Sequence, residues 1–194
     1  KAAASLLGAR HHESICDDMG VFYSDELIRK VCAVVREVGP DIMLVASPQD
    51  YMEDHMNACR LALGGAFVRG MVNYKSIPER KVVENDVTIY HAMPHGLTDG
   101  LRNPIHPDFY VDVSDVIEKK ADMLRCHKSQ KEWLDRSQGM GSYVDTMKEL
   151  NARVGKLSER FPYAEGWRRH LHLGYSRIEQ TPLEDLLAEK IGGL

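Results

Sequence analysis

Three carboxylates and one histidine lie close together, directly after a short apolar segment. Asp50, Glu53, Asp54 and His55 follow residues 41–47, whose continuous apolar run predicts a buried strand. A neutral imidazole is a good zinc ligand, and a nearby carboxylate can orient it or accept a proton. The same residues also fit a plain helix start, with Asp54 as cap and His55 on the surface. Spacing alone favours the plain helix start over metal-assisted hydrolysis.

The elements around these residues alternate between helix and strand. Ser24 or Asp25 is expected to cap a helix that runs to residue 38, which Gly39 and Pro40 end. Residues 41–47 read as a strand buried on both faces, and 161–175 are ambiguous. Further strands are expected at 87–91 and 109–113, and further helices at 54–72, 116–136, 142–154 and 182–187. This alternation predicts an α/β fold with a mostly parallel sheet, whose strand ends gather ligands.

Composition is that of one ordinary folded domain over residues 1–194. The 25 basic and 29 acidic residues give a net charge of -4, which offers no electrostatic reason for binding nucleic acid or an anionic membrane. No apolar run approaches the roughly 20 residues that span a bilayer. The four cysteines form no CxxC pair, which predicts free thiols and a cytoplasmic location.

Several segments together resemble one known family. Residues 52–55, Met-Glu-Asp-His, are similar to the His-Pro-Asp-His motif of the PIG-L/LmbE-like zinc-dependent N-acetylglucosaminyl deacetylases. The resemblance continues through residues 111–116, Lys120 and residues 126–130. It closes in residues 163–168, which resemble the Tyr-Ala-Glu-aromatic-Arg stretch of the family. The order and spacing of these motifs span most of the chain, and the family implies a Rossmann-like three-layer sandwich.

The resemblance assigns roles to individual residues of the motif. It implies that His55 is a zinc ligand and that Asp54 is the catalytic residue that supports it. Met52 stands where the family has a histidine that assists the tetrahedral intermediate, and a thioether cannot donate a proton. Three other groups are candidates for that role: Tyr51, His91 and His95.

A second family motif is absent from these 194 residues. The family's first strand ends in His-Pro-Asp-Asp, which supplies two more zinc ligands and the aspartate that activates water. The helix predicted for residues 1–7 also opens without a capping residue. Both observations lead us to expect an N-terminally incomplete domain whose first strand is missing from this chain.

Five residues are expected to contact substrate: Asp50, Tyr51, His95, His127 and Glu165. For His127, a hydrogen-bonded structural role is the leading alternative. Glu165 fits equally well as the partner of Arg168 or Arg169. His170 and His172 alternate as in a strand and are expected to be structural.

The expected function is metal-dependent hydrolysis of an N-acyl, normally N-acetyl, group on an amino-sugar conjugate. Zinc, or another divalent ion, would polarise the amide carbonyl and acidify bound water. One alternative is a non-catalytic sugar-binding or interaction protein derived from the same fold, and another is a hydrolase of a different amide or ester. The expected partner is a small-molecule amide, and the resemblance implies self-association into a homo-oligomer.

Overall fold

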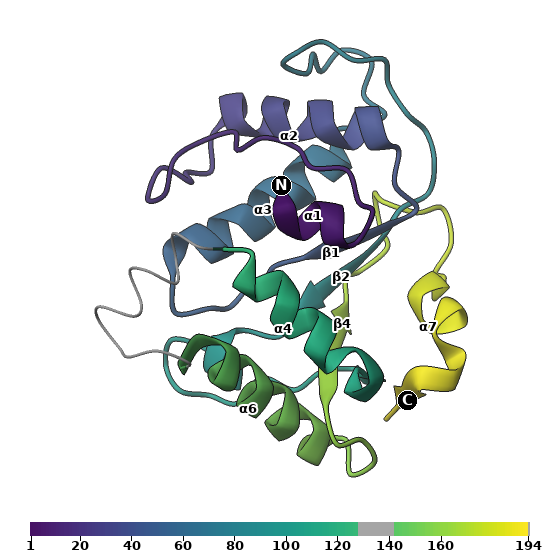
Figure 1. Cartoon of the computed structure of the whole chain (residues 1–194). Helices are drawn as coiled ribbons and strands as arrows, with labels where there is room; N and C mark the ends of the chain where they lie inside the picture. Colours follow the sequence, from purple (N-terminus) through teal and green to yellow (C-terminus); the bar gives the residue numbers. More distant parts are fainter. Residues whose placement is uncertain (128–141, 194) are drawn as a thin grey trace. The chain divides into compact units, whose positions relative to one another are not determined.

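The computed structural model describes residues 1–127 and 142–193, and residue contacts divide the chain into two units. The first unit holds residues 1–12, 109–166 and 189–194. The second unit holds residues 13–108 and 167–188. Figure 1 follows the helices and strands of both along the chain. Each unit has elements of its own, and the single domain expected from the sequence stays a prediction.

Helices α2 (Asp25–Val38) and α3 (Glu53–Phe67) pack against each other in the second unit. The hydroxyl of Ser24 accepts a hydrogen bond from the backbone N–H of Leu27 at 3.3 Å, as expected for a cap. Gly39 ends α2 in the left-handed conformation, with a φ of 56°. Both ends of α2 therefore confirm the sequence prediction, whereas α3 ends at Phe67 rather than near residue 72.

Gly65 permits the close approach of α3 to α2. A Cβ atom at this position would lie 2.6 Å from Cγ1 of Val31 and 3.0 Å from the backbone nitrogen of Cys32. At the neighbouring Gly64, a Cβ atom would meet Cγ1 of Ile28 at 3.4 Å, which is ordinary contact.

We expect Gly65→Ala to lower the free energy of unfolding by about 1–3 kcal/mol, because the helices must move apart. Gly64→Ala should be neutral or stabilise by up to about 1 kcal/mol, because alanine is the better helix former. Urea denaturation of the two variants checks the contrast. Equal effects at both positions would contradict the packing described.

The second unit contains β1 (Ile42–Val45), β2 (Thr88–Ala92) and the end of β4 (Ala164–Arg169). β1 pairs with β2 in parallel, from Ile42 opposite Thr88 to Val45 opposite His91. β2 pairs with β4 in the antiparallel direction, with Tyr90 opposite Arg169. Residues 88–91 are buried, but Leu44 of β1 is 54% exposed. The prediction that the apolar run 41–47 is buried on both faces is therefore wrong.

In the first unit, a short antiparallel ladder places Tyr110 opposite Gly192. In this unit α4 packs against α6 and α1, and α6 packs against β3. Lys120 of α4 donates to Asn151 of α6 at 3.0 Å. The elements are α1 (Ala2–Leu6), β3 (Phe109–Asp112), η2 (Ser114–Val116), α4 (Ile117–Arg125), α6 (Ser142–Leu157) and β5 (Ile191–Gly192).

The α/β class is confirmed, but the mostly parallel sheet is wrong. Of the ladders within the units, only β1–β2 is parallel, whereas β2–β4 and β3–β5 are antiparallel. β4 lies in the segment 161–175, whose pattern was ambiguous. Strand direction depends on the connections between strands and, for β5, on the path of the C-terminal residues. An apolar run has the same pattern in either direction, so the sequence does not reveal the direction.

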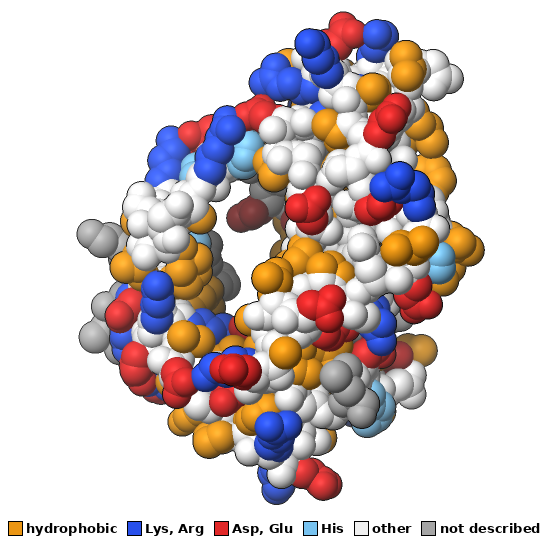
Figure 2. All heavy atoms as spheres, turned by 90° about the vertical axis from the view of Figure 1, so that its right-hand side faces the viewer, with side chains coloured by type: hydrophobic (Ala, Val, Ile, Leu, Met, Phe, Trp, Pro, Cys, Tyr) orange, Lys and Arg blue, Asp and Glu red, His pale blue; other side chains and the backbone are white. Residues whose placement is uncertain are grey.

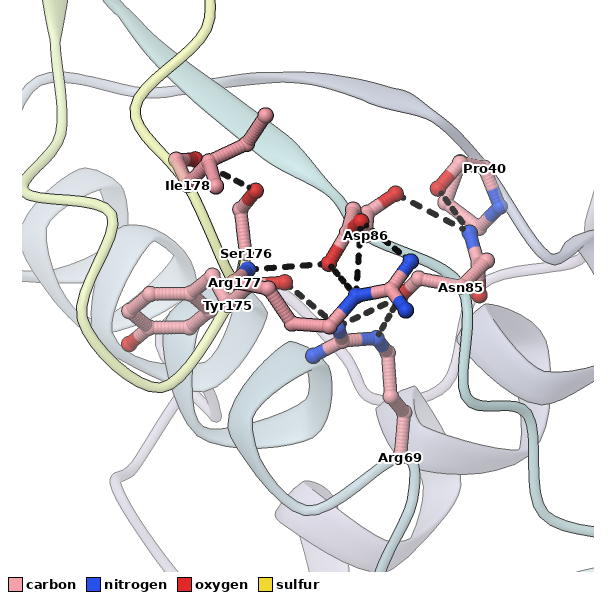
Figure 3. A network of polar contacts seen from close by, with 8 residues as sticks. All are labelled: Pro40, Arg69, Asn85, Asp86, Tyr175, Ser176, Arg177 and Ile178. Atoms are coloured by element: carbon pink, nitrogen blue, oxygen red, sulfur yellow. Dashed lines mark hydrogen bonds and ion pairs between the residues drawn. The ribbon is translucent and has the colours of Figure 1, made fainter.

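Buried arginines tie the loops of the second unit together, and Figure 3 shows one such network. Arg69 donates to the carbonyl oxygens of Ala66 at 2.8 Å and of Tyr175 at 2.5 Å. Its Nε also donates to the carbonyl of Asn85 at 3.1 Å. Beside it, Arg177 pairs with Asp86 at 2.8 Å. These bonds join the end of α3 to two loops that are far apart in the sequence.

The remaining short elements are η1 (His95–Leu97), α7 (Pro182–Leu186) and η3 (Ala188–Lys190). α7 is held to β2 by the hydroxyl of Tyr90, which donates to Glu184. On the face drawn in Figure 2, basic and acidic side chains are interspersed. Among residues 1–127 and 142–193, no helix has the length and apolarity that crossing a bilayer requires.

Candidate functional site

Asp50 is the centre of the candidate site, in the loop that follows β1. Its side chain is buried, with only 7% of the residue exposed. Oδ1 lies 3.0 Å from Nδ1 of His55 and accepts from the backbone N–H of Met52 at 3.3 Å. Oδ2 accepts from the backbone N–H of His95 at 3.4 Å. One carboxylate thus joins the loop after β1, the start of α3 and the loop after β2.

His55 lies in the first turn of α3, and its side chain is 44% exposed. Because the carboxylate of Asp50 accepts, Nδ1 of His55 carries the proton in the neutral ring. The lone pair of His55 is then on Nε2, on the opposite side of the ring. Carboxylate-backed imidazoles of this kind bind metals and accept protons in active sites.

Tyr51 and His95 stand beside this pair. The ring of Tyr51 is 5.7 Å from that of His55 and 5.8 Å from that of His95, centroid to centroid. Tyr51 is 66% exposed, and His95 is exposed in η1. The structure therefore brings together four residues that the sequence singles out: Asp50, Tyr51, His55 and His95.

Asp54 has a different partner from the one expected. Its Oδ2 accepts from the backbone N–H of Met19 at 2.6 Å, whereas Asp50 contacts His55. With Glu53, it also places negative charge in the first turn of α3, where the helix dipole favours it. The catalytic role predicted for Asp54 stays a prediction.

The two other candidate residues, His127 and Glu165, belong to the first unit. Glu165 is paired with Lys120 at 2.5 Å, not with Arg168 or Arg169. His127 is exposed at the end of α4, and its backbone N–H donates to Leu124 at 3.0 Å. Their substrate-binding roles stay predictions. The Ser129 and Gln130 part of the family motif lies outside the described residues.

Sequence reasoning did not assign a function to Arg168, which contacts the site loop. Its Nη2 donates to Oγ of Ser47 and to Oε1 of Gln49, both at 3.0 Å. These acceptors lie 121 and 119 residues away in the sequence. Recognising residues 164–169 as a strand beside β2 was the signal that could have placed Arg168 there.

A histidine pair lies behind the site loop. Nδ1 of His91 contacts the carbonyl of Ala46 at 3.1 Å, and Nε2 lies 2.9 Å from Nδ1 of His170. A carbonyl only accepts, so His91 carries its proton on Nδ1 and accepts from His170 through Nε2. Burial lowers the pKa of both imidazoles below the ordinary value. The structural role expected for His170 fits this contact.

This pair predicts a loss of stability in mild acid. Above the ordinary histidine pKa of about 6.5, both states are neutral and the contact stabilises fully. As the pH falls below that value, the unfolded chain binds protons that the folded chain does not. Each histidine then costs about 1.4 kcal/mol per pH unit until its folded pKa is reached.

We therefore expect a lower melting temperature near pH 5.5 than near pH 7.5. His170→Asn keeps a donor for His91 but does not titrate, so it should flatten the dependence. Calorimetry of both proteins at the two pH values is the measurement. An equally steep dependence in the variant would contradict the assignment.

The described residues do not form a complete zinc site. Catalytic zinc sites use three protein ligands and one open position. His55, backed by Asp50, has the chemistry of one such ligand. Within residues 1–127 and 142–193, no group of three or more His, Cys, Asp or Glu side chains could hold a metal ion. The groups present therefore do not fit a complete zinc centre.

Known families and proteins were compared with this chain for similarity. No model of a known protein family matches the chain. Diacetylchitobiose deacetylase from Thermococcus kodakarensis is 28% identical over 135 residues, which cover 67% of this chain and 47% of that protein. The match thus spans about half the length of that curated relative.

Two solved structures share the fold. GalB, a 4-carboxy-2-hydroxymuconate hydratase from Pseudomonas putida KT2440, has a TM-score of 0.69 at 22% identity, covering 93% of this chain and 71% of that one. N,N'-diacetylchitobiose deacetylase from Pyrococcus horikoshii has a TM-score of 0.65 at 21% identity, covering 94% and 65%. A hydratase and a deacetylase share this fold, so the fold alone does not select the reaction. The sequence similarity to diacetylchitobiose deacetylase supports the PIG-L/LmbE-like resemblance that the motifs of this chain indicate.

Proposed function

We propose that this protein is a deacetylase that hydrolyses the N-acetyl amide of an amino-sugar conjugate. The carrying observation is the Asp50–His55 pair after β1, in a chain homologous to a diacetylchitobiose deacetylase. Water adds to the amide carbonyl and the C–N bond breaks. The acetyl group leaves as acetate, and the nitrogen takes a proton and leaves as the free amine.

Asp50 acts in this proposal by fixing His55. Its carboxylate holds the ring orientation and keeps the proton on Nδ1, so Nε2 presents a lone pair. Tyr51 and His95 flank the pair and are the proposed contacts to the sugar. His95 is also the proposed replacement for the histidine missing at Met52, because its backbone N–H donates to Asp50.

Metal dependence is part of the proposal. We take zinc as the first choice and another divalent ion as the second, with Nε2 of His55 as one ligand. The described side chains do not complete the ligand set. Without a metal, Asp50 would still orient His55, and Tyr51 and His95 would still contact the sugar.

A second candidate function is non-catalytic sugar binding. It is favoured by Met52, which stands at the cap position of α3 and contributes only its backbone N–H to Asp50. A methionine there supplies neither a proton nor charge to a tetrahedral intermediate.

A substrate panel distinguishes these functions. N-acetylglucosamine, its disaccharide, an N-propionyl analogue and a simple acetate ester are incubated with the protein, and the products are identified by mass spectrometry. Loss of one acetyl group from the N-acetyl sugars supports the deacetylase. Cleavage of the ester alone supports a different hydrolase, and sugar binding without cleavage supports the second candidate.

A further inference from the structure

Arg168 stands next to the candidate site through the loop that carries Asp50. In the β2–β4 ladder it lies opposite His91. Its Nη2 donates to Ser47, which is 2% exposed, and to Gln49, which is exposed. Asp50, the carboxylate that holds His55, is the next residue in the chain. The guanidinium of Arg168 is therefore hydrogen-bonded to the loop that carries Asp50.

The charge of Arg168 has no carboxylate partner in the part of the chain that the structure describes. Both of its acceptors, a serine hydroxyl and a glutamine amide, are neutral. Asp108 acts on the charge only from beyond ion-pair distance, and its Oδ2 accepts from the backbone N–H of Arg169 at 2.8 Å. Burial also lowers the pKa of Arg168, which reflects a cost of holding the cation there.

In two buried arginines of the second unit, all three side-chain nitrogens donate hydrogen bonds. Arg36 donates to five backbone carbonyl oxygens through all three of its nitrogens. Arg69 likewise uses all three nitrogens on backbone carbonyls. Arg168 bonds only through Nη2, and its Nε is buried without a hydrogen-bond partner among the described residues. Unlike Arg36 and Arg69, Arg168 therefore has N–H donors that no described residue accepts from.

We propose that Arg168 binds an oxyanion, a carboxylate or phosphate group carried by the ligand of the candidate site. An oxyanion can bridge Nε and a terminal nitrogen of one guanidinium, which would satisfy the buried donor and neutralise the charge. Gln49 is the displaceable partner, because its side chain is exposed and its amide oxygen is a weaker acceptor than an anion. Ser47 stays in place and holds Nη2.

The proposal deepens the proposed function, on which it rests for the position of the site. It assigns the natural substrate to the acidic class: an N-acetylated amino sugar that carries a carboxylate or phosphate group. Its test measures anion binding and needs no turnover, so its failure is distinguishable from failure of the deacetylase proposal.

The test is a titration of the full chain with acetate and, separately, with inorganic phosphate at constant ionic strength. NMR follows the Nε–H signal of Arg168 and the amide signals of Ser47 and Gln49. We expect saturable shifts, with acetate stronger if the ligand group is a carboxylate and phosphate stronger if it is a phosphate. Arg168→Gln should weaken binding at the two amides by about tenfold or more.

Three further variants keep the test decisive. Arg177→Gln removes an exposed arginine from the same unit and should leave anion binding unchanged. Arg168→Lys keeps the charge but lacks the planar guanidinium donors, so it should bind the anion more weakly than wild type. It serves as the test variant if Arg168→Gln does not fold. Gln49→Ala removes the competing acceptor and should bind more tightly. Equal affinity in wild type and the Arg168 variants, or no saturable shift in wild type, overturns the proposal.

Discussion

Replacing Arg36 with methionine should lower the free energy of unfolding by about 3 kcal/mol or more, because five hydrogen bonds to buried or partly buried carbonyl groups are lost. Arg36 lies on α2 and is only 6% exposed. Its bonds range from 2.9 to 3.3 Å and end on the carbonyl oxygens of Val68, Arg69, Met71, Tyr74 and Arg80. These carbonyls belong to the end of α3 and the loop that follows it. Arg36 therefore caps the C-terminal end of α3 and holds the following loop against α2.

Methionine fills much of the space that the arginine stem occupies, so the loss isolates the hydrogen bonds. The matched control is Arg80→Gln, which removes an exposed arginine that pairs with Glu37 at 3.1 Å. The control should cost about 1 kcal/mol or less, as surface ion pairs do. Guanidinium denaturation of the two variants gives the comparison, and equal midpoints would refute this role for Arg36.

His55→Ala should lower the deacetylase rate by about a thousandfold or more, the largest effect expected at the site. His55 is the described imidazole that combines a half-exposed ring with a buried carboxylate behind it. Removing it takes away the Nε2 lone pair and leaves Asp50 without its side-chain partner. Asp50→Asn should cost about 10- to 100-fold, because the ring remains but loses its orientation and tautomer.

Two controls separate the site from its surroundings. His106→Ala removes an exposed histidine from the loop before β3 and should leave the rate unchanged. Asp54→Asn should cost less than Asp50→Asn, because Asp54 bonds the backbone of Met19 and not His55. Steady-state rates for the four variants test the assignment. A larger loss at Asp54 than at Asp50 would restore the role that the sequence predicted for Asp54.

Local signals in the sequence place most of the helices and strands. The Ser24 cap and the Gly39 stop bound α2, and the apolar runs mark β1 and β2, because these signals act within a few residues. Strand direction and exposure depend on partners far along the chain. The sequence therefore predicts a parallel sheet and a covered β1, where β4 runs antiparallel and Leu44 is exposed.

The candidate site shows the same division. The motif around His55 identifies the loop, and the carboxyl end of β1 places it. The choice between Asp50 and Asp54 as the partner of His55 could not be made from spacing, because it depends on how the loop folds back over α3. Arg168 was missed for a related reason: its contact with Ser47 and Gln49 exists only because β4 lies beside β2.

The expected zinc, cytoplasmic location and homo-oligomer stay predictions. The proposed chemistry makes one statement that does not depend on them: acetate and free amine appear together, one for one. A hydratase, which shares this fold in GalB, adds water without breaking an amide and releases neither.

The most direct measurement is therefore the simultaneous quantification of acetate and free amine released from an N-acetylated amino sugar by the wild-type protein. Equal amounts of the two products, rising linearly with enzyme concentration and falling to background with His55→Ala, are the result that we predict. Release of neither product, while the sugar binds unchanged to both proteins, would contradict the assignment as a deacetylase.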